Sequence, residues 1–202
     1  MTSDPSANPW VTRPATQPGA SQPLPSAAPE PASALHPQTV HPQPGGVDAP
    51  PQGLPLRSVQ RPARWWWLGC HGGAGVTSLS AAAPGGTDAF RYWPLPVAGL
   101  PLQRVVLVAR SNAAGLQAAQ LAARQWASGA VPGVQVEGLV VVADSPGRLP
   151  APLRDLSRLV SGGVPRTWTV PWMEAWRLGE PPAATVPREL AGLARDLLAL
   201  TE

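Results

Sequence analysis

Two uninterrupted apolar runs, separated by a helical pattern, constrain the fold of this chain more than any other feature. Arg104–Ala109 (RVVLVA) and Val136–Ala143 (VEGLVVVA) are predicted to be strands buried on both faces, because they lack the alternation of a half-exposed strand. Between them, Ala113–Ser128 carries apolar residues at helical spacing and follows a candidate cap, Asn112. A strand, a helix and a strand of these lengths predict a parallel βαβ unit.

Further strands and helices are expected on both sides of this unit. The strands are predicted at Arg64–Gly69, Phe90–Leu95 and Thr167–Val170, and the helices at Val76–Ala83, Leu149–Val160 and from Pro187 onwards. Strands and helices in alternation predict an α/β domain of three layers with a mostly parallel, Rossmann-like sheet.

The N-terminal part of the chain has a different composition. Of the 28 prolines, 15 lie before Arg64, and this stretch shows neither helical nor strand periodicity. Such a segment cannot bury enough apolar area to offset the entropy cost of ordering it. The sequence therefore predicts a disordered Pro/Ala/Ser/Gln-rich tail over residues 1–62 and one α/β domain over residues 63–202.

Composition excludes several classes of protein. A single cysteine, Cys70, excludes a disulfide framework and a multi-cysteine zinc cluster. No apolar run approaches the roughly 20 residues that span a bilayer, and the N-terminus does not resemble a signal peptide, so we expect a cytoplasmic protein without a membrane span. The net charge of +3 comes from dispersed arginines, which gives only weak support for nucleic-acid contact. There is no lysine, so any site that needs one is excluded.

The densest motif is the glycine-rich segment Gly69–Ser78 (GCHGGAGVTS), which follows a predicted strand and precedes a predicted helix. A strand, a glycine loop and a helix in this order direct several backbone N–H groups at one point, which favours an anion site. The phosphate-loop pattern is G-x-x-x-x-G-K-[ST], and Val76 stands at its lysine position.

This loop resembles the deviant phosphate loop (deviant Walker A) of the ParA/MinD group of SIMIBI-class P-loop ATPases, whose pattern is K-G-G-x-G-K-[ST]. Three glycines match the pattern, namely Gly72, Gly73 and Gly75. Thr77 matches the hydroxyl that binds magnesium in the group, whereas His71 and Val76 stand where the group has its two lysines.

The resemblance continues downstream in the same order. Arg104–Trp126 is similar to the strand–helix unit of the group, and Gly138–Pro146 is similar to its next strand, with Asp144 at the end near the base. Val164–Pro171 and Arg177–Pro181 resemble the late segment that walls the adenine pocket. Only Ser78–Gln103 separates the loop from the next matched strand, so the domain resembles a shortened member that lacks the middle unit. It is also similar to an uncharacterised family of high-GC bacteria.

The resemblance implies a site for ATP or ADP with Mg²⁺, with Thr77 as the metal ligand. The cofactor-binding candidates are Gly69, His71, Gly72, Gly73, Ala74, Gly75, Val76, Thr77, Ser78, Asp144 and Pro171. Because both lysines are missing, no catalytic residue is predicted and a non-catalytic role is expected. That role would use a protein partner or a second copy of the chain, in DNA partition, transfer or protein positioning.

Two alternatives remain open. The first is a residual Mg²⁺-dependent ATPase in which Thr77 acts with Asp88 or with Asp144, and an arginine such as Arg110 or Arg148 supplies positive charge. The second is a protein-interaction module that uses a Trp-rich surface and the Pro-rich tail. Trp172 and Trp176 are the better candidates for an exposed aromatic wall, whereas the other tryptophans are expected in the core.

Overall fold

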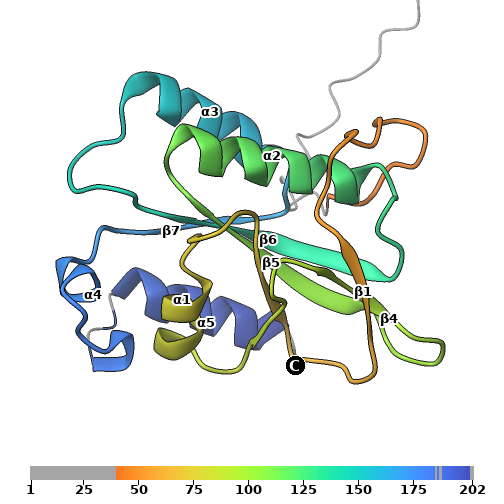
Figure 1. Cartoon of the computed structure of the whole chain (residues 1–202), viewed down its shortest axis with the longest axis horizontal. Coiled ribbons are helices and arrows are strands. Elements are labelled where there is room, and N and C mark those ends of the chain that lie inside the picture. The colour runs from red at the N-terminus through yellow and green to blue at the C-terminus, as the bar shows by residue number, and fades with distance from the viewer. Residues whose placement is uncertain (1–39, 185, 187, 201–202) are drawn as a thin grey trace, which may run out of the picture. The chain divides into compact units, whose positions relative to one another are not determined.

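The structure is a computed structural model and describes residues 40–184, 186 and 188–200; the predicted tail before residue 40 lies outside the described residues. Its centre is a five-stranded parallel sheet in the order β3-β2-β5-β6-β7. These strands are β2 (Trp66–Gly69), β3 (Thr87–Asp88), β5 (Gln103–Arg110), β6 (Val134–Val142) and β7 (Thr167–Val170). Helices cover both faces, which confirms the predicted three-layer α/β fold (Figure 1).

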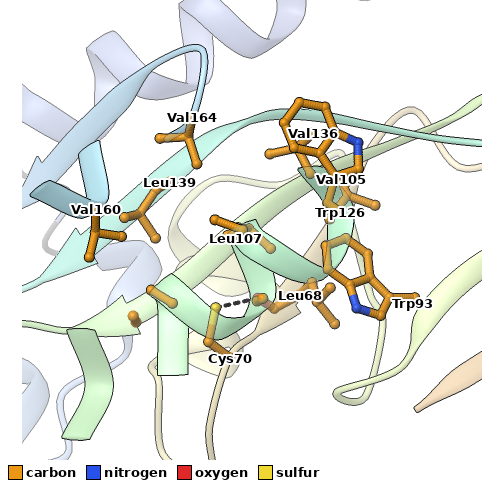
Figure 2. Close-up of a cluster of buried hydrophobic side chains, with 14 of the residues drawn as sticks. Leu68, Cys70, Trp93, Val105, Leu107, Trp126, Val136, Leu139, Val160 and Val164 are labelled. Carbon is orange, nitrogen blue, oxygen red and sulfur yellow. Dashed lines mark hydrogen bonds between the residues drawn. The ribbon is translucent and has the colours of Figure 1, made fainter. Parts of the chain in front are cut away.

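Two apolar clusters hold the helices against the sheet. On one face lie α2 (Ala113–Ala127) and α3 (Ala151–Ser161), and on the other lie α1 (Val76–Ala82) and α5 (Arg188–Leu200) (Figure 1). Figure 2 shows the first cluster, in which strand residues such as Leu107 and Leu139 pack with Trp126 of α2. β5 and β6 contribute buried side chains to both clusters, as their unbroken apolar runs predicted.

The three consecutive tryptophans at the start of β2 divide between the two faces. Trp65 and Trp67 are fully buried on the side of α1 and α5, and their rings meet edge to face at 5.8 Å. Trp66 points to the opposite face, where its Nε1 donates a hydrogen bond to Oε1 of Gln103 at 2.9 Å. These indoles are therefore core residues, as expected.

The predicted strand at Phe90–Leu95 forms only in part and outside the main sheet. It is β4 (Trp93–Pro96), which pairs in parallel with β1 (Leu56–Val59) in a separate two-stranded sheet. A parallel partner so distant in the sequence cannot be read from the local pattern. β1 itself was not predicted, because it lies in the proline-rich stretch.

Residues 40–62, the described part of the expected tail, pack on the domain. Gln125 of α2 accepts a hydrogen bond from the N–H of Leu54 at 2.8 Å and donates one to the carbonyl of Leu54 at 2.9 Å. Its Oε1 also accepts from Nε1 of Trp93 at 2.9 Å. Gln43 donates its N–H to the carbonyl of Ala127 at 2.7 Å. Residues 40–62 thus form part of the folded unit, although composition assigned them to a disordered tail.

The C-terminal part adds two short elements that were not predicted. They are α4 (Glu174–Arg177) and the 3₁₀ turn η1 (Pro182–Ala184), and both lie between β7 and α5. α5 buries Leu190, Leu193 and Leu197 against the sheet. Within the residues that the structure describes, no helix combines the length and apolarity needed to cross a membrane.

Candidate functional site

The candidate site lies at the edge of the sheet where the parallel strands end. β2, β5, β6 and β7 run in the same direction, so the loops that follow them meet at one edge. Two cavities open there. The sheet-edge cavity has a volume of about 600 Å³ and lies between the glycine loop and Pro171–Arg177. The loop cavity, of about 480 Å³, lies on the other side of the glycine loop, towards the β3–β4 connection.

All the cofactor-binding candidates predicted from the sequence line one of these two cavities. Both cavities share five residues of the loop and its surroundings, which are His71, Gly72, Gly73, Ser78 and Arg110. Asp144 and Pro171 line the sheet-edge cavity, and Gly69 and Ala74–Thr77 line the loop cavity. The structure therefore brings the predicted residues together, while what they bind remains a prediction.

The glycines of the loop are required by its backbone. Gly73 has φ = 75° and Gly75 has φ = 105°, both in the left-handed region that a side chain disfavours. Gly75 stands at the N-cap of α1, and no side chain caps the helix. The backbone N–H groups of residues 76–78 consequently have no acceptor in the described part of the chain. These donors are available to an external acceptor.

His71 connects the loop to β5. Its Nε2 accepts the backbone N–H of Arg110 at 3.0 Å, and its Nδ1 lies 2.8 Å from the carbonyl oxygen of Gly72. The neutral tautomer with a proton on Nδ1 satisfies both hydrogen bonds. A Cβ on Gly115 would lie 2.9 Å from Nε2, so the glycine at this position of α2 permits the contact. His71 therefore braces the loop and does not replace the lysine that the resemblance places there.

Arg110 supplies the positive charge that the loop itself lacks. Its Nε donates to the carbonyl of Gly73 at 3.2 Å, and its Nη1 donates to the carbonyl of Ala143 at 2.9 Å. A Cβ on Gly75 would lie 4.0 Å from Nη2. These two bonds use two of the five N–H donors of the guanidinium, and the others have no acceptor among the described residues. Arg148 lies elsewhere, in a neighbouring cavity beyond Ala143.

The two carboxylates that were considered for a metal lie on opposite sides of the loop. Asp88 lines the loop cavity together with the exposed Thr77, and its Oδ1 accepts the N–H of Phe90 at 2.7 Å. Asp144 is exposed and lines the sheet-edge cavity, and its own N–H donates to Oγ of Ser111 at 3.0 Å. Over the described ranges, no three His, Cys, Asp or Glu side chains come together as a metal-binding group.

An aromatic wall faces the loop across the sheet-edge cavity. Trp172 and Trp176 line it beside Pro171, and Nε1 of Trp172 donates to Oε2 of Glu174 at 2.7 Å. The sequence singled out these two tryptophans, and both lie at the cavity. Arg177 lines the same wall, so both charged and aromatic groups face the opening.

Cys70 offers no nucleophile at this edge. The side chain is buried in the apolar cluster of Figure 2, with Sγ 4.0 Å from the carbonyl of Leu68. Burial raises the pKa of the thiol to about 12 and outweighs the backbone hydrogen bond at Val108, which lowers it. A thiol in this environment stays protonated at neutral pH, so Cys70 and the adjacent His71 do not form a nucleophilic pair.

One residue at the loop was missed by the sequence analysis. Arg91, from the β3–β4 connection, lines the loop cavity, and a Cβ on Gly72 would lie 4.0 Å from its Nη1. Nothing in the local sequence around Arg91 indicates that its side chain reaches Gly72, which lies 19 positions earlier in the chain.

Comparison with known proteins assigns most of the chain to a family. No curated protein and no solved structure matches the chain. Residues 63–191, more than half of the chain and nearly all of the predicted α/β domain, match the profile of a family of unknown function, DUF6668. The match includes the glycine loop, Arg91, Arg110 and the aromatic wall, so the protein belongs to the family DUF6668.

Proposed function

We propose that this chain is a cytoplasmic, degenerate P-loop protein of the ParA/MinD type that binds a nucleotide or another phosphate-bearing anion weakly at Gly72–Thr77. It does not hydrolyse the ligand and acts through a protein partner or a second copy of itself. The observation that carries the proposal is the loop: its left-handed glycines leave backbone donors unpaired beside the guanidinium of Arg110.

Weak binding follows from the make-up of the site. A few backbone amides and one arginine stabilise an anion by roughly 4–7 kcal/mol, which corresponds to a dissociation constant of roughly 0.01–1 mM in the absence of salt. Screening by salt weakens the contribution of a half-exposed arginine, so we expect roughly 0.1–10 mM at physiological ionic strength. α1 has only seven residues, which limits what its dipole adds.

The absence of lysine argues against turnover. Phosphoryl transfer needs cations against the charge that develops on the transferred group, together with a positioned water. The guanidinium of Arg110 is held by the carbonyl groups of Gly73 and Ala143, and Val76 is apolar. Losing one preorganised charge of this kind typically costs several kcal/mol of transition-state stabilisation.

Titration calorimetry on the full chain tests the binding. ADP, ATP and inorganic phosphate are titrated with and without Mg²⁺ into the wild type, Gly73→Ala and Gly99→Ala. Gly73 and Gly99 both have positive φ and open space where a Cβ would stand, so the two substitutions strain the backbone alike. We expect Gly73→Ala to lose binding because its methyl group blocks the approach to the loop, whereas Gly99→Ala binds like the wild type. Equal binding by all three proteins would refute the site.

A residual Mg²⁺-ATPase is the second candidate, and the cavity that each carboxylate lines distinguishes its two forms. Thr77 and Asp88 line the same cavity, whereas Asp144 lines the other, so the structure favours Asp88 as the partner of Thr77. Our proposal predicts no ATP turnover above that of Gly73→Asp. Turnover that is lost in Asp88→Asn but kept in Asp144→Asn would replace the non-catalytic proposal with this candidate.

A further inference from the structure

Two consecutive residues beside the loop cavity have strained backbones. Phe90 has φ = 50° and Arg91 has φ = 64°, and they are the only non-glycine residues with positive φ in the described part of the chain. Left-handed geometry is unfavourable for a non-glycine residue, because its Cβ comes too close to the following carbonyl oxygen. A bulky aromatic residue is among the least suited to it.

Local hydrogen bonds hold this strained turn in place. The N–H of Ala89 donates to the carbonyl of Trp67 at 2.9 Å, which fixes the end of β3 to β2. Oδ1 of Asp88 then accepts the N–H of Phe90 at 2.7 Å, and the N–H of Tyr92 donates to the carbonyl of Ala89 at 3.0 Å. The turn is therefore specified on both sides of the strained pair.

Packing does not explain the strain. Phe90 is 69% exposed, and Arg91 is exposed as well. Neither side chain joins a core cluster, and Arg91 has no hydrogen bond or ion pair among the described residues. Strained residues that bury nothing commonly belong to ligand-binding segments. The turn brings the guanidinium of Arg91 to the loop, 4.0 Å from the position of a Cβ on Gly72.

Arg91 and Arg110 therefore reach the same loop at two separate points. Arg91 lies beside Gly72, and Arg110 lies beside Gly75, each 4.0 Å from the respective Cβ position. Both line the loop cavity, whose one carboxylate, Asp88, is already engaged by the N–H of Phe90. The charge on this side of the loop is therefore net positive.

We propose that Arg91 and Arg110 form a clamp for two linked phosphoryl groups, so that the ligand is a phosphate chain and not a single phosphate. This inference rests on the proposed function and specifies the ligand of the same loop. Guanidinium groups bind phosphate oxygens through paired hydrogen bonds, and two of them at separate points of the loop suit a diphosphate. A single phosphate would engage one arginine and leave the other unused.

The test compares inorganic pyrophosphate with inorganic phosphate, titrated into the full chain by calorimetry at constant ionic strength. The variants are Arg91→Ala, Arg110→Ala and, as a control, Arg154→Ala. Arg154 is exposed on α3 and has no ion pair in the described structure, so its variant removes the same charge away from the loop. Wild type and Arg154→Ala are expected to bind pyrophosphate at least tenfold more tightly than phosphate.

The arginine variants should lose that preference. Arg91→Ala is expected to weaken pyrophosphate binding about tenfold and to leave phosphate binding within twofold, because the single phosphate relies on Arg110 and the loop. Arg110→Ala should weaken both ligands, since its guanidinium also bonds to the carbonyl of Gly73. Equal affinity of the wild type for the two ligands would overturn the clamp, as would unchanged pyrophosphate binding in Arg91→Ala.

These outcomes separate the clamp from the proposed function. If Gly73→Ala abolishes phosphate binding but Arg91→Ala keeps the preference for pyrophosphate, the loop is a phosphate site and the clamp is wrong. If neither ligand binds the wild type, both proposals fail.

A second variant at position 91 tests whether the strained backbone positions the Arg91 side chain for the ligand. Glycine tolerates φ = 64°, so Arg91→Gly should raise the unfolding midpoint by about 2–4 °C while it weakens pyrophosphate binding as much as Arg91→Ala does. A gain in stability without a loss of binding would show that the strained turn does not act on the ligand.

Discussion

Two junctions between a strand and a helix lie side by side at the same edge of the sheet, yet they are built in opposite ways. At the β5–α2 junction, Asn112 caps the helix by accepting the N–H of Gly115 at 2.8 Å. Ser111 donates its N–H to the carbonyl of Val142, and its Oγ accepts the N–H of Asp144. At the β2–α1 junction, glycine stands at the N-cap and no side chain caps the helix.

The helices that follow differ in the same sense. α2 has 15 residues and buries Leu116, Ala119 and Trp126 in the core, whereas α1 has seven residues and buries Leu79 and Ala82. The β5–α2 junction thus pairs one N–H group of its helix with a side chain and carries part of the core. The β2–α1 junction leaves its donors open and is surrounded by Arg91 and Arg110. Under the proposed function, side chains at the junction, and not the shared topology, determine which of the two binds an anion.

The largest effect is expected where the two junctions touch. A Cβ on Gly115 would lie 2.4 Å from the carbonyl oxygen of Arg110 and 2.9 Å from Nε2 of His71. Gly115→Ala should therefore destabilise the protein by about 2–4 kcal/mol, measured by urea unfolding. Gly192→Ala in α5 is the control, because a Cβ there meets nothing within 4 Å and alanine favours a helix. Wild-type stability of Gly115→Ala would show that the junctions are not coupled.

Adding a cation at the β2–α1 junction should have the next largest effect, on the affinity for phosphate. Val76→Lys places an ammonium group at the first residue of α1, and we expect phosphate to bind about tenfold more tightly because a charge-assisted bond is gained. Ala81→Lys adds the same charge to the exposed face of α1 and should leave the affinity unchanged. Equal effects of the two variants in a phosphate titration would indicate a general charge effect and no loop site.

Removing the side-chain cap at the β5–α2 junction should lower the free energy of unfolding. Asn112→Ala is expected to lower the free energy of unfolding by about 1 kcal/mol, because the N–H of Gly115 loses its acceptor. Thr77→Ala at the β2–α1 junction should lower the free energy of unfolding by less than about 0.5 kcal/mol, since Thr77 is exposed and makes no hydrogen bond within the described structure. Denaturant unfolding of both variants measures the difference, and equal losses would contradict the contrast between the junctions.

The smallest expected effect is the pH dependence of stability that arises from Cys70, at the end of β2. Burial raises the pKa of its thiol from the ordinary value of 9.0 to about 12. The folded state therefore disfavours the thiolate, so this contribution to stability is complete below pH 9 and is lost as the pH rises towards 12. At pH 9.5 we expect a loss of about 0.8 kcal/mol relative to pH 7, which Cys70→Ala should not show. Parallel pH profiles of the two proteins would exclude a buried thiol.

The sequence was sufficient where local pattern and tertiary structure agree. The apolar runs of β5 and β6 and the helical spacing of α2 predicted their places to within a few residues, and Asn112 is the predicted cap. The glycine loop was also foreseeable, because glycine is what its left-handed backbone requires. Parallel topology then brings Asp144 and Pro171 to the same edge.

Other features depend on contacts that no local pattern encodes. β1 lies in a proline-rich stretch, and its pairing with β4 joins segments more than thirty positions apart. The left-handed turn at Phe90 and Arg91 opposes the preferences of both residues, so local reasoning would reject it. The bond from Arg110 to the carbonyl of Ala143 exists because β5 and β6 are adjacent and in register.

The hydrogen bonds of Gln125 are expected to limit how sequences of this family diverge. One amide side chain serves both backbone groups of Leu54 and the indole of Trp93, and Leu54 lies outside the matched residues 63–191 whereas Gln125 lies within them. Replacing Gln125 would leave three polar groups without partners at once. A segment equivalent to residues 53–59 should therefore occur together with glutamine at this position. Relatives that begin after that segment still need an acceptor there for the indole of Trp93, which other polar residues can supply.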